Sequence, residues 1–222
     1  LAARDFSTDY NVLYSIQPSA DTRVSINVVM TNLSNNFYAS SYDIAVGFSD
    51  IRNIKAADNG GAVTPIVTKN DLGSKIEVPF NEQVLGLGKK LNFNITFDTR
   101  EVAQNLNNVW DVNIPGISNE NDFSNFNVTV NYPITLGKPT FLKPNLPSAL
   151  NNANENSIKF TKEELGSSGI SMAFGNFQNY DFNLTYHLEN KNLFATQTEI
   201  ALPPTTNYQD VYINKILPKR LE

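Results

Sequence analysis

Residues able to perform catalysis are scarce in this chain. Its 222 residues include one histidine and no cysteine, which excludes a thiol nucleophile and every zinc site that uses sulfur. The histidine, His187, lies in an alternating segment, on the polar side together with Asp181 and Glu189. An acid–base dyad with a carboxylate is one interpretation, and an exposed strand histidine is the one we favour. The sequence contains no Gly-x-Ser-x-Gly, so a serine triad is not predicted.

Carboxylate and amide oxygens occur together in two polar segments, 119–122 and 58–59. Such oxygens are calcium ligands, but neither segment has the spacing of an EF-hand loop, and we interpret both as polar turns. Glu163 and Glu164 are adjacent on a short predicted helix, where they make a poor pair for glycoside hydrolysis. Segment 86–90 precedes a strand rather than a helix, which is typical of a turn and not of a phosphate loop. We therefore predict no catalytic residue, no metal and no cofactor.

Aromatic side chains are the remaining candidates for ligand binding. The chain has nine tyrosines and one tryptophan, which would suffice for a platform on which a carbohydrate stacks. Most of these residues fall on the apolar side of predicted strands, where core packing is their expected role. The tyrosines least accounted for in this way are the predicted ligand-binding residues: Tyr38, Tyr208 and Tyr212.

Four Asn-x-Ser/Thr triplets begin at Asn32, Asn94, Asn127 and Asn183. The alternation places the last three on exposed faces of predicted strands. A chain rich in asparagine produces such triplets by chance, and acceptors in the middle of a strand are unusual. We therefore interpret the four triplets as unmodified strand sequence.

The charge of the chain limits its partners. The formal net charge is −5, and only 18% of the residues are charged. A nucleic-acid partner is not predicted, because phosphate binding requires a basic surface. The longest basic runs are pairs, so a basic amphipathic helix on a membrane surface is not predicted either. No apolar run approaches the roughly 20 residues that span a bilayer.

Period-two alternation recurs along the chain and predicts strands that bury one face. In segment 91–97, leucine, phenylalanine and isoleucine alternate with asparagine and threonine. Similar alternation occurs in 23–32, 42–48, 110–114 and 126–132. The predicted class is all-β, with two consecutive antiparallel β-sandwich (Ig-like) domains and at most one or two short helices.

Turn signals agree with this class. The sequence Asp58-Asn-Gly-Gly61 stands between two predicted strands and indicates a tight hairpin. Segment 70–73 indicates a second turn. Thr161, followed three residues later by Glu164, resembles a capping box, which predicts one short helix there.

Prolines mark the predicted domain boundary. Four of them fall in fifteen residues and an asparagine-rich run follows, so this segment is predicted to connect rather than to pair centrally. The predicted division is a larger sandwich at 1–136, a connector at 137–156, a smaller sandwich at 157–220 and a cloning remnant at 221–222. The prolines are Pro133, Pro139, Pro144 and Pro147.

The first residues have the small-residue character found near a signal-peptidase site. We therefore expect an extracytoplasmic fragment of a longer protein, with its signal peptide removed and no membrane span within the fragment itself.

Several short sequence segments resemble the N-terminal extracytoplasmic region of bacterial transglutaminase-like membrane proteins, whose catalytic core is papain-like. They are Phe174-Gly-Asn-Phe-Gln178, the segments 181–190 and 199–209, and, in the first half, Val78-Pro-Phe-Asn81 and 109–115. The resemblance implies β-rich domains that precede a catalytic core on the bacterial cell surface. Because this chain lacks cysteine, no catalytic residue of that family transfers to any of its positions.

The expected function is a non-catalytic accessory or spacer module that positions a downstream transglutaminase-like domain of the same protein. The alternative is a binding module for cell-envelope polysaccharide or a protein partner, which requires exposed aromatic and polar side chains in one concavity or an exposed apolar patch. An independent hydrolase requires an acid pair in a cleft and is the least favoured of the three.

Overall fold

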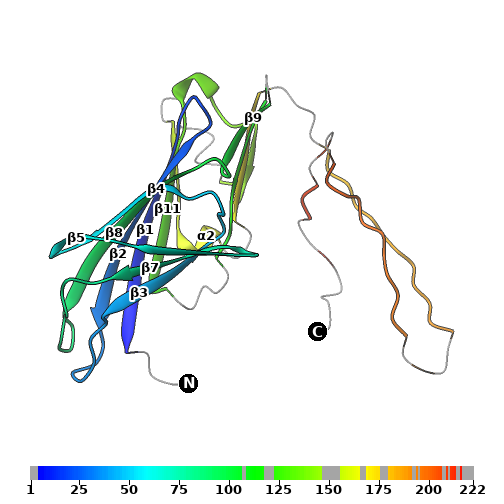
Figure 1. Ribbon diagram of the computed structural model, residues 1–222. Helices are drawn as coiled ribbons and strands as arrows, with labels where there is room; N and C mark the ends of the chain where they lie inside the picture. Colours follow the sequence, from blue (N-terminus) through cyan, green and yellow to red (C-terminus); the bar gives the residue numbers. More distant parts are fainter. Residues whose placement is uncertain are drawn as a thin grey trace. The chain divides into compact units, whose positions relative to one another are not determined.

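The protein is described by a computed structural model (Figure 1). Two compact units make up the chain, Leu1–Gln178 and Asn179–Glu222. The described residues are 5–106, 109–117, 123–146, 156–165, 169–175, 180–191, 194, 196–206, 209, 211–213 and 216.

Strands dominate the first unit, which confirms the predicted all-β class with several antiparallel sheets. One short helix, α2 (Lys162–Leu165), and one 3₁₀ turn, η2 (Ile134–Leu136), accompany them in the described residues. The strands are β1 (Phe6–Ile16), β2 (Thr22–Asn32), β3 (Ser41–Val46), β4 (Arg52–Asp58), β5 (Gly61–Val63), β6 (Ile66–Asn70), β7 (Gly73–Pro79), β8 (Lys90–Thr99), β9 (Ala103–Leu106), β10 (Val109–Ile114), β11 (Asn125–Asn131), β12 (Phe141–Lys143), β13 (Ser157–Phe160) and β14 (Ile170–Gly175).

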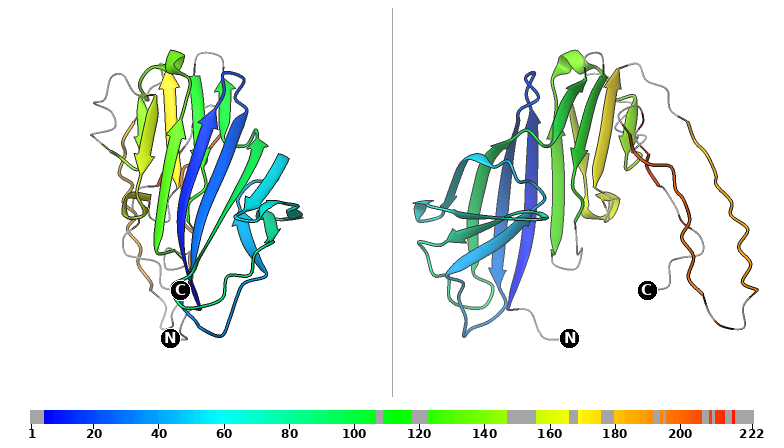
Figure 2. Two further views of the ribbon diagram at one scale, coloured as in Figure 1. Left: turned by 90° about the vertical axis from the view of Figure 1, so that its left-hand side faces the viewer. Right: turned by 45° about the vertical axis from the view of Figure 1, so that its right-hand side comes forward.

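The strands form three sheets. The largest has seven strands in the order β13-β11-β1-β2-β8-β4-β5, and its long central strands run side by side in Figure 2. A four-stranded sheet has the order β12-β14-β10-β9, and a three-stranded sheet has the order β3-β7-β6. All pairings are antiparallel except that of β1 with β11, which is parallel. A parallel pair needs a long crossover connection, and here most of the chain between β1 and β11 supplies it.

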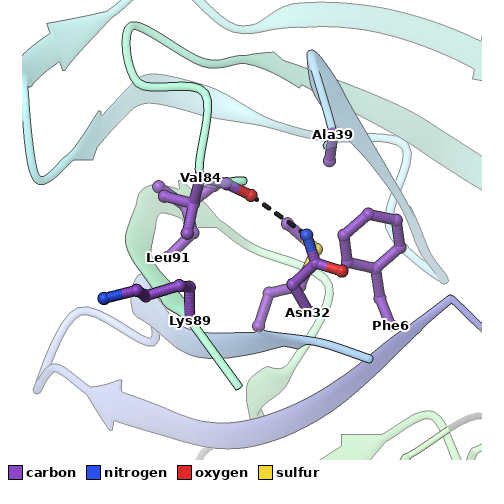
Figure 3. Close-up of a pocket in the computed structure, with 7 residues that line it drawn as sticks. Phe6, Asn32, Ala39, Val84, Lys89 and Leu91 are labelled. Carbon is purple, nitrogen blue, oxygen red and sulfur yellow. Dashed lines mark hydrogen bonds between the residues drawn. The ribbon is translucent and has the colours of Figure 1, made fainter. Parts of the chain in front are cut away.

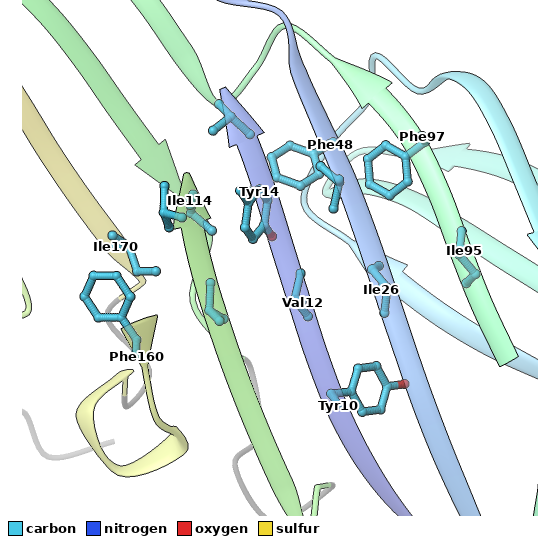
Figure 4. Close-up of a cluster of buried hydrophobic side chains, with 14 of the residues drawn as sticks. Tyr10, Val12, Tyr14, Ile26, Phe48, Ile95, Phe97, Ile114, Phe160 and Ile170 are labelled. Atoms are coloured by element: carbon cyan, nitrogen blue, oxygen red, sulfur yellow. The ribbon is translucent and has the colours of Figure 1, made fainter. Parts of the chain in front are cut away.

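One face of the seven-stranded sheet forms the core (Figure 4). In the register of the sheet, Val128, Val12, Ile26 and Ile95 stand side by side on four neighbouring strands, and all are buried. The period-two alternation predicted for β2, β8 and β11 is therefore the observed burial pattern, and β1, which was not predicted, has the same pattern.

Both smaller sheets pack on this core face. The ring of Tyr42 in β3 lies 5.4 Å from that of Phe93 in β8. At the other side, the ring of Tyr132, just after β11, lies 4.8 Å from that of Phe174 in β14. Edge-on and tilted ring pairs at such distances are favourable packing arrangements. The unit is thus a sandwich in which one wide sheet is covered by two narrow ones.

The predicted turns and helix are confirmed. The tight hairpin joins β4 to β5 through Asp58 and Gly61, which face each other across the turn. Segment 70–73 joins β6 to β7. Helix α2 begins after Thr161, whose backbone N–H donates to Oε2 of Glu164 at 2.8 Å, as a capping box requires.

The division of the chain differs from the predicted one. Strand β13 pairs with β11, and β14 pairs with β10, so residues predicted to open a second sandwich complete the sheets of the first unit. The boundary between compact units follows Gln178 instead of occupying 137–156. Pro133, Pro139 and Pro144 lie in connections between sheets of one unit, and proline marks a connection without showing whether it joins two domains.

The second unit contains, among its described residues, one isolated bridge between Thr206 and Gln209 and no strand. Two stretches, 180–191 and 196–206, run side by side in Figures 1 and 2. The hydroxyl of Tyr186 donates to the carbonyl of Ala201, which links the two stretches. A smaller sandwich was predicted at 157–220, but no strand is assigned in the described part of this unit.

A buried asparagine ties two loops together at one end of the seven-stranded sheet (Figure 3). Asn32, the last residue of β2, is 2% exposed. Its Nδ2 donates to the carbonyl oxygens of Phe37 at 2.6 Å and Val84 at 3.1 Å, and its Oδ1 accepts the N–H of Ser34 at 2.8 Å. These three bonds satisfy the buried carboxamide of Asn32, which would otherwise lower the stability of the fold. Asn32 therefore holds the loop after β2 against the loop before β8.

A chain that ends at Gln178 is expected to keep one cooperative unfolding transition, because it retains every strand of the three sheets. A chain that ends at Leu136 lacks β12, β13 and β14 and leaves apolar residues such as Val130 and Val112 without partners. We expect it to lose the cooperative transition, measured by circular dichroism during urea unfolding. A chain ending at Leu136 that unfolds with the midpoint of the full chain would contradict the observed division.

Replacing Asn32 by alanine is expected to lower the free energy of unfolding by about 2–4 kcal/mol, because the three hydrogen bonds of its buried carboxamide to the two loops are lost. Urea unfolding followed by circular dichroism measures the loss. The control is Asn27→Ala in the same strand, where the side chain is exposed and a change of about 0.5 kcal/mol or less is expected. Equal effects of the two replacements would show that Asn32 has no special role.

Candidate functional site

The face of the seven-stranded sheet that turns away from the core, here called the outer face, carries a line of asparagines. Asn127, Asn11, Asn27 and Asn94 are paired in register across β11, β1, β2 and β8. All four are exposed. Neighbouring strands lie ~4.8 Å apart, so the four side chains form an evenly spaced row, here called the asparagine row.

Part of the asparagine row is free to bind a ligand. Nδ2 of Asn127 donates to Oδ1 of Asn11 at 3.2 Å. The side chains of Asn27 and Asn94 make no hydrogen bond within the part of the chain that the structure describes. Each free carboxamide offers two N–H donors and one carbonyl acceptor.

Rows made mostly of short polar side chains flank the asparagines. On one side, Thr129, Leu13, Ser25 and Thr96 are paired across the same four strands. On the other side, Nδ2 of Asn125 donates to Oδ1 of Asp9 at 2.9 Å. Because cross-strand neighbours on one face stand close together, the outer face is mainly a surface of amides and hydroxyls, which Leu13 and Val29 interrupt.

An open hollow of about 620 Å³ lies at one end of the outer face, beside the turn that joins β1 to β2. Two arginines and two aspartates provide its charged groups, so their formal charges balance. Its lining residues are Ser15, Gln17, Ser19, Asp21, Arg23, Arg52, Asn53 and Asp98.

Ion pairs hold these charged groups in place. Nε and Nη2 of Arg23 donate to the two carboxylate oxygens of Asp98 at 2.9 and 3.2 Å. Nη2 of Arg52 donates to Oδ1 of Asp21 at 2.6 Å, and Nε of Arg100 donates to the same oxygen at 3.1 Å. A two-bond arginine–carboxylate pair fixes the orientation of both groups.

A bulge in β4 completes the hollow. Arg52 pairs with Asp98 and Lys55 pairs with Thr96, so the strand has one extra residue between these points. Asn53 lies in this interval with φ 52°, a left-handed conformation that asparagine tolerates better than most residues. Its Nδ2 donates to Oδ2 of Asp98 at 2.9 Å. The bulge therefore directs an amide toward the ion pair.

Hydrogen bonds keep the aspartates ionised. The guanidinium of Arg23, followed by the amide of Asn53, holds the pKa of Asp98 below its ordinary value of 3.8. Arg52, followed by Arg100, lowers the pKa of Asp21 in the same way. The groups are therefore fixed donors and acceptors at neutral pH rather than acids that exchange protons.

The arrangement favours a neutral ligand that is rich in hydroxyl groups. The asparagine row contains no ionisable side chain, and the charges of the hollow are matched. Hydroxyl groups both donate and accept hydrogen bonds, which corresponds to what free carboxamides offer. Among the described residues, no three acidic or imidazole groups gather into a site for a metal ion.

The three predicted tyrosines lie in different parts of the chain. Tyr38 lies in the loop after β2 and is 47% exposed. Tyr212 belongs to the second unit and is half-buried. Tyr208 lies outside the described residues. Of the two tyrosines that the structure describes, Tyr38 belongs to a loop rather than to a strand of the outer face, and the stacking platform stays a prediction.

The remaining residues considered for metal binding or catalysis are Asp58, segment 119–122 and His187. The carboxylate of Asp58 accepts the backbone N–H groups of Gly60 at 2.9 Å and Asn81 at 2.6 Å, and so holds a turn. Segment 119–122 lies outside the described residues. His187 is exposed in the second unit. Among the described residues no helix has the length and apolar character needed to cross a bilayer.

The four glycosylation triplets differ in their surroundings. The buried amide of Asn32 is engaged with two carbonyl groups, so it is not accessible for modification in the folded protein. Asn94 and Asn127 belong to the asparagine row. Asn183 is exposed in the second unit.

The asparagine row was not predicted as a site. Its signal is present in the sequence, because asparagines occupy outward positions of several alternating segments. Their alignment depends on the register between distant strands, which alternation within one strand does not specify.

Comparisons with known proteins give a limited result. No protein-family model matches the chain, and no curated protein matches it. Among solved structures, native yeast LTA4 hydrolase is similar with a TM-score of 0.44 and 13% identity, over 80% of this chain and 30% of that chain. A mutant M1 zinc metallopeptidase from Deinococcus radiodurans, bound to a Tyr-Ser-Ala substrate, has a TM-score of 0.43 and 13% identity, over 78% of this chain and 43% of that chain.

The chain spans less than half the length of these two proteins. Similarity at this level does not indicate which activity the chain has. The comparisons provide no link to transglutaminase-like proteins, so that resemblance stays a prediction.

Replacing Arg23 by glutamine is expected to raise the pKa of Asp98 toward its ordinary value, because both bonds from the guanidinium are lost. A carboxyl whose pKa is lower when folded stabilises the fold above its ordinary pKa, and this contribution is lost as the pH falls through the folded pKa. The variant should therefore lose less stability than the native chain in that acidic range. Arg23 is 64% exposed, so solvent screening keeps the difference small.

Titration of the Asp98 carboxyl carbon by nuclear magnetic resonance measures this pKa directly. Arg100→Gln is the matched control, because Arg100 bonds Asp21 instead and should raise only the pKa of Asp21. An unchanged pKa of Asp98 in the Arg23 variant would refute the assigned role of the pair.

Proposed function

We propose that this chain is a non-catalytic accessory module whose outer face binds a neutral, extended polysaccharide. The observation that carries the proposal is the asparagine row, with unengaged carboxamides on Asn27 and Asn94. An evenly spaced row of amides on an open sheet face fits a repeating polymer better than a compact small molecule, which binds in an enclosed concave site.

The spacing of the row supports an extended polymer. Adjacent strands place a carboxamide every ~4.8 Å, which is comparable to the length of one sugar residue in an extended β-linked chain. A polymer lying across the strands would therefore meet an equivalent group at each of several successive residues. Such repeated weak contacts add up in affinity when the geometry lets them act together.

The matched charges support a neutral polymer. An acidic or basic polymer would gain most from a surface of opposite charge, whereas the charged groups of the hollow already pair with each other. The hollow is proposed to receive one end of the bound segment, where the ion-paired groups and the amide of Asn53 accept and donate hydrogen bonds.

The sequence resemblance suggests where such a module would act and what it would position. A module beside a transglutaminase-like domain on the bacterial cell surface would meet cell-envelope polysaccharide, and binding there would position the neighbouring domain. A spacer module without a ligand is the competing proposal, and it predicts no saturable binding to any polymer.

Co-sedimentation of the purified chain with insoluble cell-wall preparations and with a neutral β-glucan tests the proposal. We expect saturable binding that changes little with salt. The double replacement Asn27→Ala with Asn94→Ala is expected to weaken binding at least roughly tenfold, since two hydrogen bonds of about 1 kcal/mol each are lost.

The control for this experiment is Asn105→Ala, an exposed asparagine in β9 of the four-stranded sheet. It should bind like the native chain. Unchanged binding by the double variant would move the site away from the asparagine row. Failure of the native chain to bind any polymer would favour the spacer.

A further inference from the structure

Large apolar side chains project from the two loops that Asn32 ties together, here called the loop pair (residues 33–40 and 80–89). Five of them are between 46% and 61% exposed. Two adjacent loops that expose so many large apolar groups mark an interaction surface, whereas single exposed apolar residues need no explanation. The five residues are Leu33, Phe37, Tyr38, Leu85 and Leu87.

Backbone and side-chain hydrogen bonds hold the two loops of the loop pair together. Beyond the side chain of Asn32, the backbone N–H of Asn32 donates to the carbonyl of Lys89, and that of Gly88 donates to the carbonyl of Asn32, both at 2.8 Å. The N–H of Leu87 donates to Oδ1 of Asn35 at 3.1 Å. These bonds fix the backbone of one loop to the other, so the exposed groups are held in place.

Two glycines turn the leucines outward. Gly86 and Gly88 have φ of 113° and 76°, conformations that residues with a side chain adopt only at a cost. In the sequence Leu85-Gly-Leu-Gly88 they allow a tight loop whose apolar side chains point into solvent. A loop that served only as a connection would not require leucine at both positions.

The space beneath the loop pair is filled. Phe6, Met30, Ala39, Val84 and Leu91 surround Asn32 (Figure 3), and the space between them has a volume of about 0 Å³. A partner side chain therefore has no cavity to enter, so the apolar groups form a projection.

The area is small for a protein partner. An aromatic side chain buries ~200 Å² when fully covered, so five half-exposed groups offer roughly 500 Å². A stable protein–protein interface needs about 800 Å² from each side. Insertion of apolar groups into a lipid surface needs no matching partner surface and works with a small projection.

The polar groups near the loop pair also suit a lipid surface. Residues 33–40 contain no charged side chain. Lys89 and Lys90 follow Leu87 after one glycine, while the acidic Glu82 lies near the start of the same loop and Asp5 lies beside the start of the other. Tyrosine is favoured where a membrane meets water, and Tyr38 is next to Phe37.

We propose that the loop pair inserts into a phospholipid surface, with the leucines and Phe37 among the acyl chains and Tyr38 at the headgroups. The inference does not depend on polysaccharide binding, because the outer face contributes no residue to it. Tyr38, predicted from sequence as a ligand-binding residue, would then contact lipid rather than a sugar.

Flotation of the full chain with phosphatidylcholine vesicles, with and without phosphatidylglycerol, tests this proposal. We expect the chain to float with the vesicles and the variant Leu85→Asp with Leu87→Asp to lose at least roughly nine-tenths of the binding. The control is Leu72→Asp, a leucine that is 90% exposed in the turn between β6 and β7, which should bind like the native chain.

A tryptophan probe keeps the test independent of folding defects in the aspartate variant. The native Trp110 is buried, so its fluorescence should change little with vesicles. Phe37→Trp should show a blue shift on vesicle addition, and Leu72→Trp should not. The proposal is overturned if the native chain does not float, if Leu72→Asp abolishes flotation equally, or if Phe37→Trp shows no shift.

Self-association is the other outcome that would overturn it. Sedimentation velocity without vesicles would then show a dimer that the double aspartate variant dissociates, while flotation of the native chain is missing. The occupant of the loop pair would in that case be a second copy of the chain.

Discussion

The register of β11, β1, β2 and β8 is the constraint on which the core and both proposed surfaces depend. Side chains alternate between the two faces of a strand, so a slip of one residue would exchange the buried row of Val12 and Ile26 for the row of Asn11 and Asn27. A buried carboxamide without a partner costs roughly 1–3 kcal/mol, and each displaced apolar side chain would lose its burial. The same register therefore makes the core apolar and the outer face polar.

Two asparagines of β2 show how position decides the role of one residue type. Asn27 stands on the outer face, and its carboxamide remains available to solvent. Asn32, five residues later, falls on the core face, where its amide must find internal partners. The nearest partners are carbonyl groups of the two loops at the end of the strand. The need to satisfy one buried amide thus organises the loop pair.

The sequence predicted what depends on neighbours along the chain: alternating strands, the hairpin at Asp58, and the capping box of Thr161 and Glu164. It could not predict which strands, far apart along the chain, pair with each other. Strand β13 carries the same local pattern whether it pairs within the first unit or opens a new one, so the predicted boundary at 137–156 followed the prolines instead. Likewise, Tyr38 was recognised as unaccounted for, but Leu85 and Leu87 belong to the partner loop of the loop pair, which lies far along the sequence. Their proximity follows from the pairing of β2 with β8.

The two proposed surfaces lie at different places on β2. Arg23 borders the hollow at the start of this strand, and Asn32 ends it. Nine residue steps of an extended strand correspond to roughly 30 Å, beyond the range in which two substitutions normally influence each other. The physical bases also differ, since fixed amides and hydroxyls bind through hydrogen bonds whereas the loop pair relies on apolar area. A ligand on the outer face would therefore leave the loop pair accessible, and the first unit has room to contact a polymer and a lipid surface at the same time.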